Sequence, residues 1–507
     1  MRPVSFPRRR SLGALALLCF AVLIFSYLLS LTIALACLAM PALLFSHLAV
    51  DAISLLLAYV ALFIGATIIW SIFPRRDKRK LLGVEIDLSS QPRLKQLIED
   101  IAARIGQRMP DTVYLIPDAN AFVTERGRRR IMGLGLPLIA AMSTAEFSGV
   151  LAHEFAHYYS GDTRLGPRVY QTRTAMARTI QNVGAANSAA SSLARIPVAG
   201  ILYVLVVFAL VGYWNLFLRF TKVVSHQQEY RSDELACFIA GPAAMAEGLR
   251  MVTMIGAAAP LFWRGAINPV LNAGHLPPLA DGFRRYLAAP GPFLNASCAL
   301  LKARKNPPSN PYDTHPPLKL RLERIGRVQA NEETQPDPSR ALALLDDPST
   351  LERRLLALMA PGVDVAALRP MDWDSAAQTV WLPLWRKTVA EHGKLLGNQT
   401  IGALPELVPT LPQIGARIPD PPGRLLTREH RTQRASDLVW MALSIRMHEH
   451  GWDIHAHPAW LFLQKDKERI TPRERVAALQ QGKTSAQEWA AWCARSGLAE
   501  VRLNPFE

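Results

Sequence analysis

The stretch His153-Glu154-Phe155-Ala156-His157 is the most informative part of this chain, because it carries the pattern H-E-x-x-H inside a segment with helical periodicity. Two histidines four residues apart lie on one face of a helix, close enough to hold one metal ion. Glu154 projects to a different side, where it can reach a metal-bound water. The spacing therefore predicts a zinc site with a glutamate placed as general base.

The residues before this motif predict where its helix begins. Ser143 and Glu146 have the spacing of an S-x-x-E capping box, and apolar residues follow at helical spacing as far as Phe155. Gly161 predicts the end of the helix. The alternative interpretation is an ordinary core helix that happens to carry two histidines.

The first 80 of the 507 residues differ in composition from the rest. Two apolar segments, at about residues 12–40 and 52–73, are each long enough to span a bilayer, and Asp51 lies in the turn between them. Arginines and lysines at residues 8–10 and 75–80 flank the outer ends, so the positive-inside rule predicts a hairpin with both ends in the cytoplasm. We expect a multi-pass protein of the inner (cytoplasmic) membrane with its catalytic domain facing the cytoplasm. A cleaved signal peptide is the alternative.

The net charge of +16 raises the question of a nucleic-acid partner. No recognisable nucleic-acid-binding motif accompanies it, and part of the charge lies beside the apolar segments, where anionic lipid headgroups are the simpler partner. We therefore predict contact with the lipid bilayer and not with nucleic acid. The five cysteines are scattered and odd in number, which is not a disulfide framework and agrees with a reducing compartment.

After the first 80 residues the pattern changes to that of a folded domain. Residues 86–109 predict an amphipathic helix. Residues 112–116 and 120–123 have the composition of strands, and residues 131–136 predict a returning strand after a basic hairpin tip at 126–130. A small β-sheet is therefore expected directly before the helix of the H-E-x-x-H motif.

A third charge-free apolar stretch, residues 197–218, is followed by a predicted helix at 221–240. A single crossing there would put His153 and Glu229 on opposite sides of the membrane. Residues 172–195 are too polar for a good partner span, so we expect residues 197–218 to be re-entrant or docked laterally. The expected organisation is a hairpin at 1–80, a catalytic domain at 81–328, a linker at 329–340 and a soluble domain of unknown role at 341–507.

A hydrolytic zinc site uses three protein ligands and one water, so His153 and His157 need a third partner. Glu229 and Asp233 are four residues apart and share a helix face. Glu229 could bind the metal while Asp233 accepts a hydrogen bond from a ligand histidine. The alternatives are an exposed acidic pair, or His226 as the third ligand.

Four separated motifs occur in an order that resembles a known family. They are Asn120-Ala121-Phe122-Val123, the H-E-x-x-H motif followed by Gly161-Asp162, Glu229-Tyr230-Arg231-Ser232-Asp233 and Thr314-His315-Pro316-Pro317-Leu318. Together they resemble the membrane-integral zinc endopeptidases that include the HtpX heat-shock proteases and the type I CAAX prenyl endopeptidases, over residues 85–330. Ser232 stands where the family usually has alanine, and HtpX-type members carry two spans where only residues 197–218 are obvious here.

The resemblance implies one Zn²⁺ per chain, held by His153, His157 and Glu229, with Asp233 supporting a ligand. It also implies that Asn120, Ala121 and Phe122 lie along a cleft where an extended protein or peptide substrate adds as a strand. Glu154 would be the catalytic base. His315 would either stabilise the oxyanion or belong to a structural turn.

We therefore predict an α+β fold that is mostly α: a gluzincin-like H-E-x-x-H metalloprotease domain with a small β-sheet, preceded by a transmembrane helical hairpin. The implied function is zinc-dependent endoproteolysis of membrane or misfolded proteins, as in protein quality control. CAAX-type peptide processing and a non-catalytic zinc-containing scaffold or chaperone are the alternatives. The sequence assigns no oligomeric state.

The C-terminal region offers two further patterns. His448, Glu449 and His450, with His455 and His457 nearby, are dense enough for a second metal site. Their spacing of two does not share a helix face, so a surface loop is expected instead. Trp373, Trp381 and Trp385 have the spacing of one helix face, which predicts a core rather than a docking face.

Overall fold

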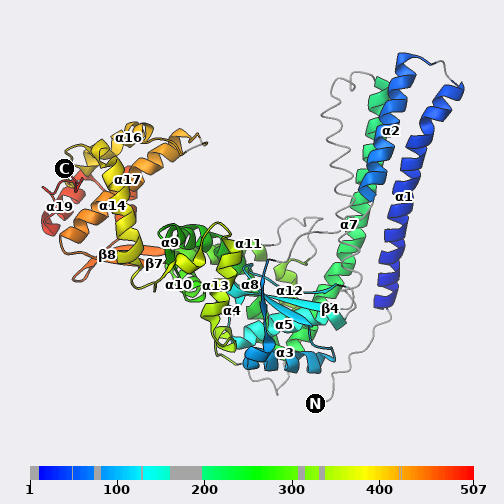
Figure 1. The fold of residues 1–507 in the computed structure, drawn as a ribbon, viewed down its shortest axis with the longest axis horizontal. Helices are drawn as coiled ribbons and strands as arrows, with labels where there is room; N and C mark the ends of the chain where they lie inside the picture. Colours follow the sequence, from blue (N-terminus) through cyan, green and yellow to red (C-terminus); the bar gives the residue numbers. More distant parts are fainter. Residues whose placement is uncertain are drawn as a thin grey trace. The chain divides into compact units, whose positions relative to one another are not determined.

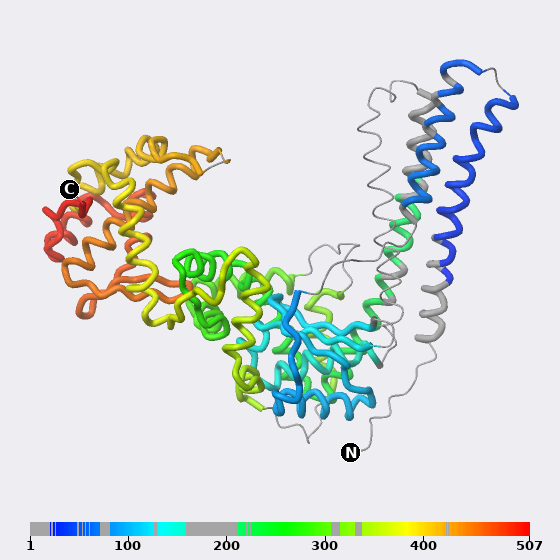
Figure 2. Tube along the Cα trace, viewed as in Figure 1, coloured from blue at the N-terminus to red at the C-terminus, as the bar shows by residue number. Residues whose placement is uncertain are grey.

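The computed structural model describes residues 11–47, 50–72, 82–126, 129–159, 197–305, 315–329, 337–421, 423 and 425–506 (Figure 1). They form two compact units: unit 1 comprises residues up to 253 and 298–346, and unit 2 comprises residues 254–297 and 347 onward. The tube in Figure 2 follows the same path by residue number. The predicted fold class, α+β and mostly helical with small sheets, is confirmed.

Unit 1 begins with two long apolar helices, α1 (Ser11–His47) and α2 (Ala52–Ile72), which pack lengthwise (Figure 1). A Cβ atom at Gly65 would lie 2.9 Å from the carbonyl oxygen of Ala34, so glycine permits their close approach. Among the described residues, Tyr27–His47 is the one helical segment long and apolar enough to cross a membrane, and the apolar part of α2, Leu57–Trp70, is shorter. The basic flanks at residues 8–10 and 75–80 lie outside the described residues, so the two-span hairpin stays a prediction.

The third apolar stretch belongs to α7, a single helix of 44 residues from Pro197 to Ala240. The expected re-entrant turn within residues 197–218 is not found, because the helix continues without reversal into the polar segment that follows. From Arg219 onward the side chains of α7 become polar, but the backbone stays helical because arginine and lysine are good helix formers. The alternative, lateral docking, agrees with the packing of α7 on α1, where the rings of Phe25 and Tyr213 are 5.8 Å apart. Residues 172–195 lie outside the described residues.

The predicted sheet is present as four strands in the order β1-β2-β4-β3. β2 and β4 are parallel, and the other two pairs are antiparallel. The strands are β1 (Val84–Ile86), β2 (Thr112–Ile116), β3 (Ala121–Arg126) and β4 (Arg129–Gly135). β3 therefore lies at an edge of the sheet, and the tip of its hairpin, residues 127–128, lies outside the described residues.

Helices cover this sheet and form the rest of unit 1 (Figure 1). The predicted amphipathic helix is α3 (Pro92–Ile105), which begins after the short helix η1 (Leu88–Ser90) and buries Leu94, Ile98, Ile101, Ala102 and Ile105. The other helices are α4 (Leu136–Ala141), α5 (Thr144–Tyr159), α12 (Leu318–Ile325), η4 (Ala341–Leu344) and the first part of α8 (Pro242–Phe262), which continues into unit 2 after residue 253.

The end of the expected linker pairs with the start of α5. The amide of Thr144 donates to the carbonyl of Ser339 at 2.7 Å, and the amide of Ala145 donates to the carbonyl of Asp337 at 3.0 Å. Two donors at a helix N-terminus, which lack partners inside the helix, are satisfied in this way. Residues 330–336 of the linker lie outside the described residues.

Unit 2 contains the rest of the chain's elements. Its first group is η3 (Trp263–Ile267), α9 (Asn268–Asn272), β5 (His275–Leu276), α10 (Leu279–Ala288), the start of α11 (Pro290–Arg304), α13 (Pro348–Met359), η5 (Val365–Ala367) and β6 (Arg369–Pro370). Its second group is η6 (Ala377–Trp381), α14 (Leu382–His392), η7 (Gly393–Leu396), α15 (Leu404–Leu407), η8 (Val408–Thr410), α16 (Leu411–Arg417), α17 (Arg428–Glu449), β7 (Asp453–His457), β8 (Trp460–Lys465), β9 (Glu468–Ile470), α18 (Pro472–Gln480) and α19 (Ala486–Ser496).

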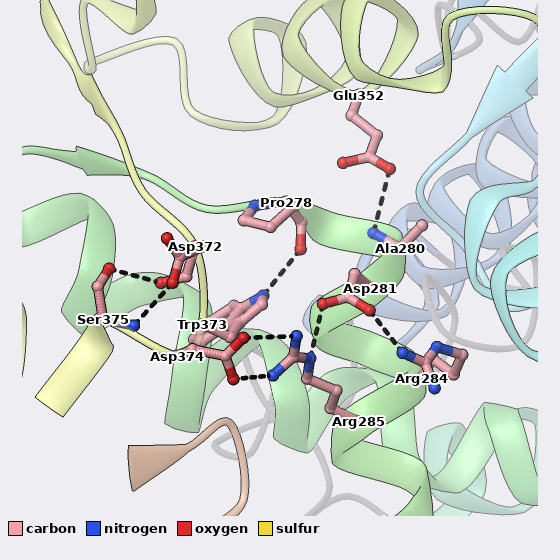
Figure 3. Close-up of polar contacts among 10 residues, drawn as sticks. All are labelled: Pro278, Ala280, Asp281, Arg284, Arg285, Glu352, Asp372, Trp373, Asp374 and Ser375. Atoms are coloured by element: carbon pink, nitrogen blue, oxygen red, sulfur yellow. Dashed lines mark hydrogen bonds and ion pairs between the residues drawn. The ribbon is translucent and has the colours of Figure 1, made fainter. Parts of the chain in front are cut away.

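Residues 254–297, expected with the catalytic domain, pack in unit 2 around Trp373. The indole nitrogen of Trp373 donates to the carbonyl of Pro278 at 2.9 Å, and its ring fills the space where a Cβ at Gly282 would be (Figure 3). Arg285 joins Asp281 and Asp374, both drawn in Figure 3. Trp373 lies before η6, outside the helices that carry Trp381 and Trp385, so it does not share a helix face with them. Its ring packs against α10 at Gly282.

The main core of unit 2 surrounds α17 and includes the buried rings of Trp385, Trp452 and Trp489. His448 and His450, predicted to lie in a surface loop, end α17 instead. Each places its Nδ1 atom 2.8–2.9 Å from a backbone carbonyl, of Trp452 and Arg446 respectively. The ring of His450 contacts a carbonyl of the last turn of α17, and the ring of His448 contacts the backbone just beyond it. Within the described ranges these histidines belong to no group that could hold a metal.

Candidate metal centre

The helix of the H-E-x-x-H motif begins as predicted. The amide of Ser143 donates to the carboxylate of Glu146 at 2.8 Å, and the amide of Glu146 donates to Oγ of Ser143 at 3.3 Å, which is a reciprocal capping box. Phe147, Leu151 and Phe155 are fully buried along one face of α5. Gly161, the predicted stop, lies outside the described residues.

His153 and His157 lie on the same face of α5, one turn apart. Their ring centroids are 4.9 Å apart, with the rings perpendicular. Ligand atoms of His153, Glu154 and His157 all lie within 4.8 Å of one another, and Glu154 is half-exposed beside the buried His153. These three residues are the group among the described residues that could hold a metal ion.

Glu229 of α7 lies close to both histidines of α5. Its Oε2 atom is 3.4 Å from Nε2 of His153, and its Oε1 atom is 3.7 Å from Nε2 of His157. The residue is buried, and Oε2 accepts no hydrogen bond from any described residue, although charged nitrogens lie close to it. A buried carboxylate oxygen without a hydrogen bond is costly unless a cation occupies the place that it faces.

These separations match those of ligands around one zinc ion. Two donor atoms that each lie about 2.0–2.1 Å from a tetrahedral metal are roughly 3.4 Å apart. Two imidazole nitrogens and one carboxylate oxygen, with a place left for water, form the donor set of hydrolytic zinc sites. The residues present therefore fit zinc.

Asp233, one turn after Glu229, lies behind His153. Its Oδ1 atom is 2.9 Å from Nδ1 of His153, so it can hold the ring with Nε2 facing Glu229. Arg321 of α12 donates to both oxygens of Asp233, at 2.6 and 2.8 Å, and lies 3.5 Å from Oε2 of Glu229. A bidentate arginine thus supports the carboxylate that orients the histidine.

Sequence reasoning missed Arg321. It is one of 57 lysines and arginines, and no spacing rule connects α12 to a helix that lies almost ninety positions earlier. Its signal is burial: an arginine whose side chain is only 10% exposed needs anionic partners, and burial follows from the fold rather than from local sequence.

The electrostatics of the centre come from this charge cluster. Burial lowers the pKa of His153, but the nearby carboxylates of Asp233 and Glu229 outweigh this effect and raise that pKa to about 10. Burial raises the pKa of Asp233, yet Arg321 and His153 hold it below its ordinary value. The pKa of Glu229 is likewise held well below its ordinary range, since His153 and His315 overcome the effect of burial. Both carboxylates are therefore ionised at neutral pH.

The two remaining histidine candidates differ in position. His315 places Nδ1 2.9 Å from Oε2 of Glu229, while 65% of its side chain is exposed. It therefore borders the centre from the solvent side. His226, the rival third ligand, makes a ring contact with Tyr230, with centroids 6.5 Å apart.

Asn120, Ala121 and Phe122 lie at the start of the edge strand β3, which packs against α5. Ala121 is buried, Phe122 is half-buried and Asn120 is exposed. Tyr158, next to His157, ties α5 to this hairpin: its hydroxyl donates to the carbonyl of Ile131 at 3.1 Å, with the carbonyl of Thr124 at 3.3 Å. The edge strand is therefore fixed relative to the histidines.

The site can now be compared with known proteins. The family model of peptidase family M48 matches residues 88–329, a range that contains strands β2 to β4, both histidines, Glu229 and Arg321. Residues 88–329 belong to peptidase family M48. The HtpX-like resemblance is thereby confirmed, and the family is one of metallopeptidases. No solved structure matches this chain.

Among curated proteins this chain is similar to several HtpX proteases. A "Protease HtpX homolog" of Methanopyrus kandleri is 24% identical over 245 residues, which cover 46% of this chain and 66% of the relative. "Protease HtpX" of Shewanella baltica (strain OS195) is 30% identical over 114 residues, covering 21% and 40%, and that of Shewanella loihica is 29% identical over the same length. The chain thus spans less than two thirds of the length of these relatives.

Proposed function

We propose that this chain is a membrane-bound, zinc-dependent endopeptidase that cleaves membrane or misfolded proteins. The observation that carries the proposal is that the buried carboxylate of Glu229 lies 3.4 Å from Nε2 of His153 and 3.7 Å from Nε2 of His157, with Glu154 beside the two histidines. Membership in peptidase family M48 supports the reaction class, and the similarity to HtpX proteases supports a role in protein quality control.

One Zn²⁺ per chain would be held by His153, His157 and Glu229. When bound, zinc activates a water molecule and polarises the scissile carbonyl. Glu154 accepts a proton from the attacking water and returns it to the leaving amine, which makes it the general base and then the general acid. Its half-exposed position beside two buried ligands suits a group that must reach both water and substrate.

Asp233 and Arg321 act through His153. Asp233 accepts a hydrogen bond from Nδ1–H and so fixes the tautomer that leaves Nε2 free to bind metal. Arg321 keeps Asp233 ionised. His315 lies at the solvent side of Glu229, where its imidazole can donate to a developing oxyanion.

The substrate is proposed to bind as an extended strand along β3. An edge strand offers unpaired backbone groups to a peptide, and Asn120, Ala121 and Phe122 would line the cleft. This geometry selects unfolded or locally extended segments, because a folded substrate cannot supply a free strand.

The proposed location is the inner membrane, with α1 and α2 as a hairpin and the catalytic unit in the cytoplasm. The apolar segment Tyr27–His47 supports membrane attachment, and the basic flanks of the hairpin support the orientation. CAAX-type processing and a non-catalytic zinc scaffold are the alternatives, and both are separable by experiment.

The ligand set is tested by comparing Glu229→Gln with Glu234→Gln in the full chain in detergent. Glu234 is an exposed glutamate on the same helix. We expect Glu229→Gln to bind zinc at least tenfold more weakly and to cleave neither casein nor a misfolded membrane protein, while Glu234→Gln behaves as wild type. Unchanged zinc content in Glu229→Gln would contradict the proposed ligand set, and intact zinc without cleavage in wild type would favour the scaffold.

A further inference from the structure

The helix α11 (Pro290–Arg304), labelled in Figure 1, has large apolar side chains that are exposed to solvent. Phe293, Leu294 and Leu301 are 53%, 63% and 55% exposed. Only Pro292 and Ala296 of its fifteen residues are buried. A helix of this length gains most of its stability from packing, so an outer face this apolar needs a partner.

The two sides of α11 differ in side-chain size and exposure. Pro292, Ala296, Ala299 and Ala303 recur at helical spacing and form the inner, buried or partly buried face. The opposite face is formed by Leu294, Cys298, Leu301 and Lys305, all exposed at the same spacing. Apolar residues on the inner face explain how the helix is held, whereas the leucines on the outer face leave more than half of their side-chain surface exposed.

The charges around this outer face favour one kind of partner. Lys302, Arg304 and Lys305 are exposed at its C-terminal end, and no aspartate or glutamate occurs from Pro290 to Lys305. Burial of exposed apolar side chains and attraction of basic residues to anionic headgroups both favour binding to a lipid surface.

We propose that the outer face of α11 docks onto the anionic lipid surface as a second membrane contact, distinct from the apolar helices at the N-terminus. Phe293, Leu294 and Leu301 enter the boundary between headgroups and acyl chains, and the three basic residues bind lipid phosphates. The proposal rests on membrane attachment but not on peptidase activity.

Cys298 is a natural reporter for this contact, because it lies on the outer face between Leu294 and Leu301 and is exposed. The full chain is placed in nanodiscs of phosphatidylcholine alone, or with about one third phosphatidylglycerol. Its reaction with an uncharged, polar maleimide is followed by peptide-resolved mass spectrometry. The buried Cys493 serves as an internal control for folding.

We expect Cys298 to react about tenfold more slowly in the anionic nanodiscs, and high salt to restore the rate by screening. The variant Lys302→Gln/Arg304→Gln/Lys305→Gln should lose this protection. Its matched control, Arg353→Gln/Arg354→Gln/Lys387→Gln, removes three exposed charges elsewhere and should keep it.

Equal reaction rates in both lipids would overturn the proposal. If Cys298 reacts slowly and at the same rate in both lipids, protein and not lipid covers the outer face of α11. If its reaction slows as the protein concentration rises, the partner is a second copy of the chain. Either outcome replaces the lipid surface as the occupant.

Discussion

Arg321 shows how a single side chain can organise the centre without touching substrate. It is buried among anionic partners, and its two hydrogen bonds hold Asp233 against His153. Removing the guanidinium leaves Asp233 as a buried charge with one partner fewer, and a broken buried pair costs about 3–5 kcal/mol. The ring of His153 would also lose its fixed orientation.

We therefore predict that Arg321→Gln weakens zinc binding by about 10–100-fold, which dialysis against graded chelator concentrations measures. The exposed Arg327 lies at the end of the same helix, so Arg327→Gln is the matched control. If both variants retain zinc equally well, Arg321 has no role in positioning the ligands.

The buried thiol of Cys493 gives unit 2 a pH dependence with a definite sign. Burial raises its pKa from 9.0 to about 11, so the folded state holds this proton more tightly than the unfolded state. The stabilisation is fully present below about pH 9 and is lost as the pH rises toward 11, at roughly 1.4 kcal/mol per pH unit.

Cys493→Ala should therefore show a shallower loss of stability between pH 9 and 11 than wild type, measured as the urea midpoint by tryptophan fluorescence. Cys298→Ala, which removes an exposed thiol, should follow the wild-type curve. Parallel curves for wild type and Cys493→Ala would show that this thiol does not titrate differently in the folded state.

At the scale of elements, the hairpin of β3 and β4 depends on a glycine opposite the proposed cleft. Phe122 and Gly133 are cross-strand partners, and a Cβ at Gly133 would lie 2.3 Å from the ring of Phe122. The ring therefore lies over the bare backbone of β4. Any side chain at position 133 must displace Phe122 or distort the hairpin.

Gly133→Ala should destabilise the protein by about 1–3 kcal/mol and raise KM for extended peptides, because overpacking moves a cleft residue. In Phe122→Ala/Gly133→Ala the clash is gone, so the stability loss should be smaller than the sum of the single changes. Additive losses in this double-mutant cycle would contradict direct contact between the two positions.

Local patterns predicted the elements whose causes are local. The capping box at Ser143 predicted the start of α5, and the composition of residues 112–116 predicted β2. The helix predicted at 221–240 ends, as α7 does, at Ala240. The continuity of α7 could not be predicted from hydropathy. Hydropathy reports the surroundings of the side chains, and these can change along a helix whose backbone continues unbroken. The partners of His153 were predicted on α7, where spacing applies, but not on α12, since that contact exists only in the folded chain.

For the whole molecule, α7 joins the apolar helices to the catalytic centre. Its 44 residues extend about 66 Å, more than twice the hydrocarbon thickness of a bilayer. Its first half packs beside α1, and its second half carries Glu229 and Asp233. The same helix thus supplies both the proposed membrane contact and the proposed third ligand, which favours substrates presented at the membrane.

The central claim is that the centre of this M48 chain binds zinc for catalysis and that Glu154 is the base. The most direct measurement compares wild type with Glu154→Gln and the exposed control Glu99→Gln in detergent, recording bound zinc and cleavage of casein and a misfolded membrane protein. We predict about one zinc per chain in all three proteins, with cleavage lost only in Glu154→Gln. Wild type without zinc, or Glu154→Gln that still cleaves at the wild-type rate, would contradict the claim.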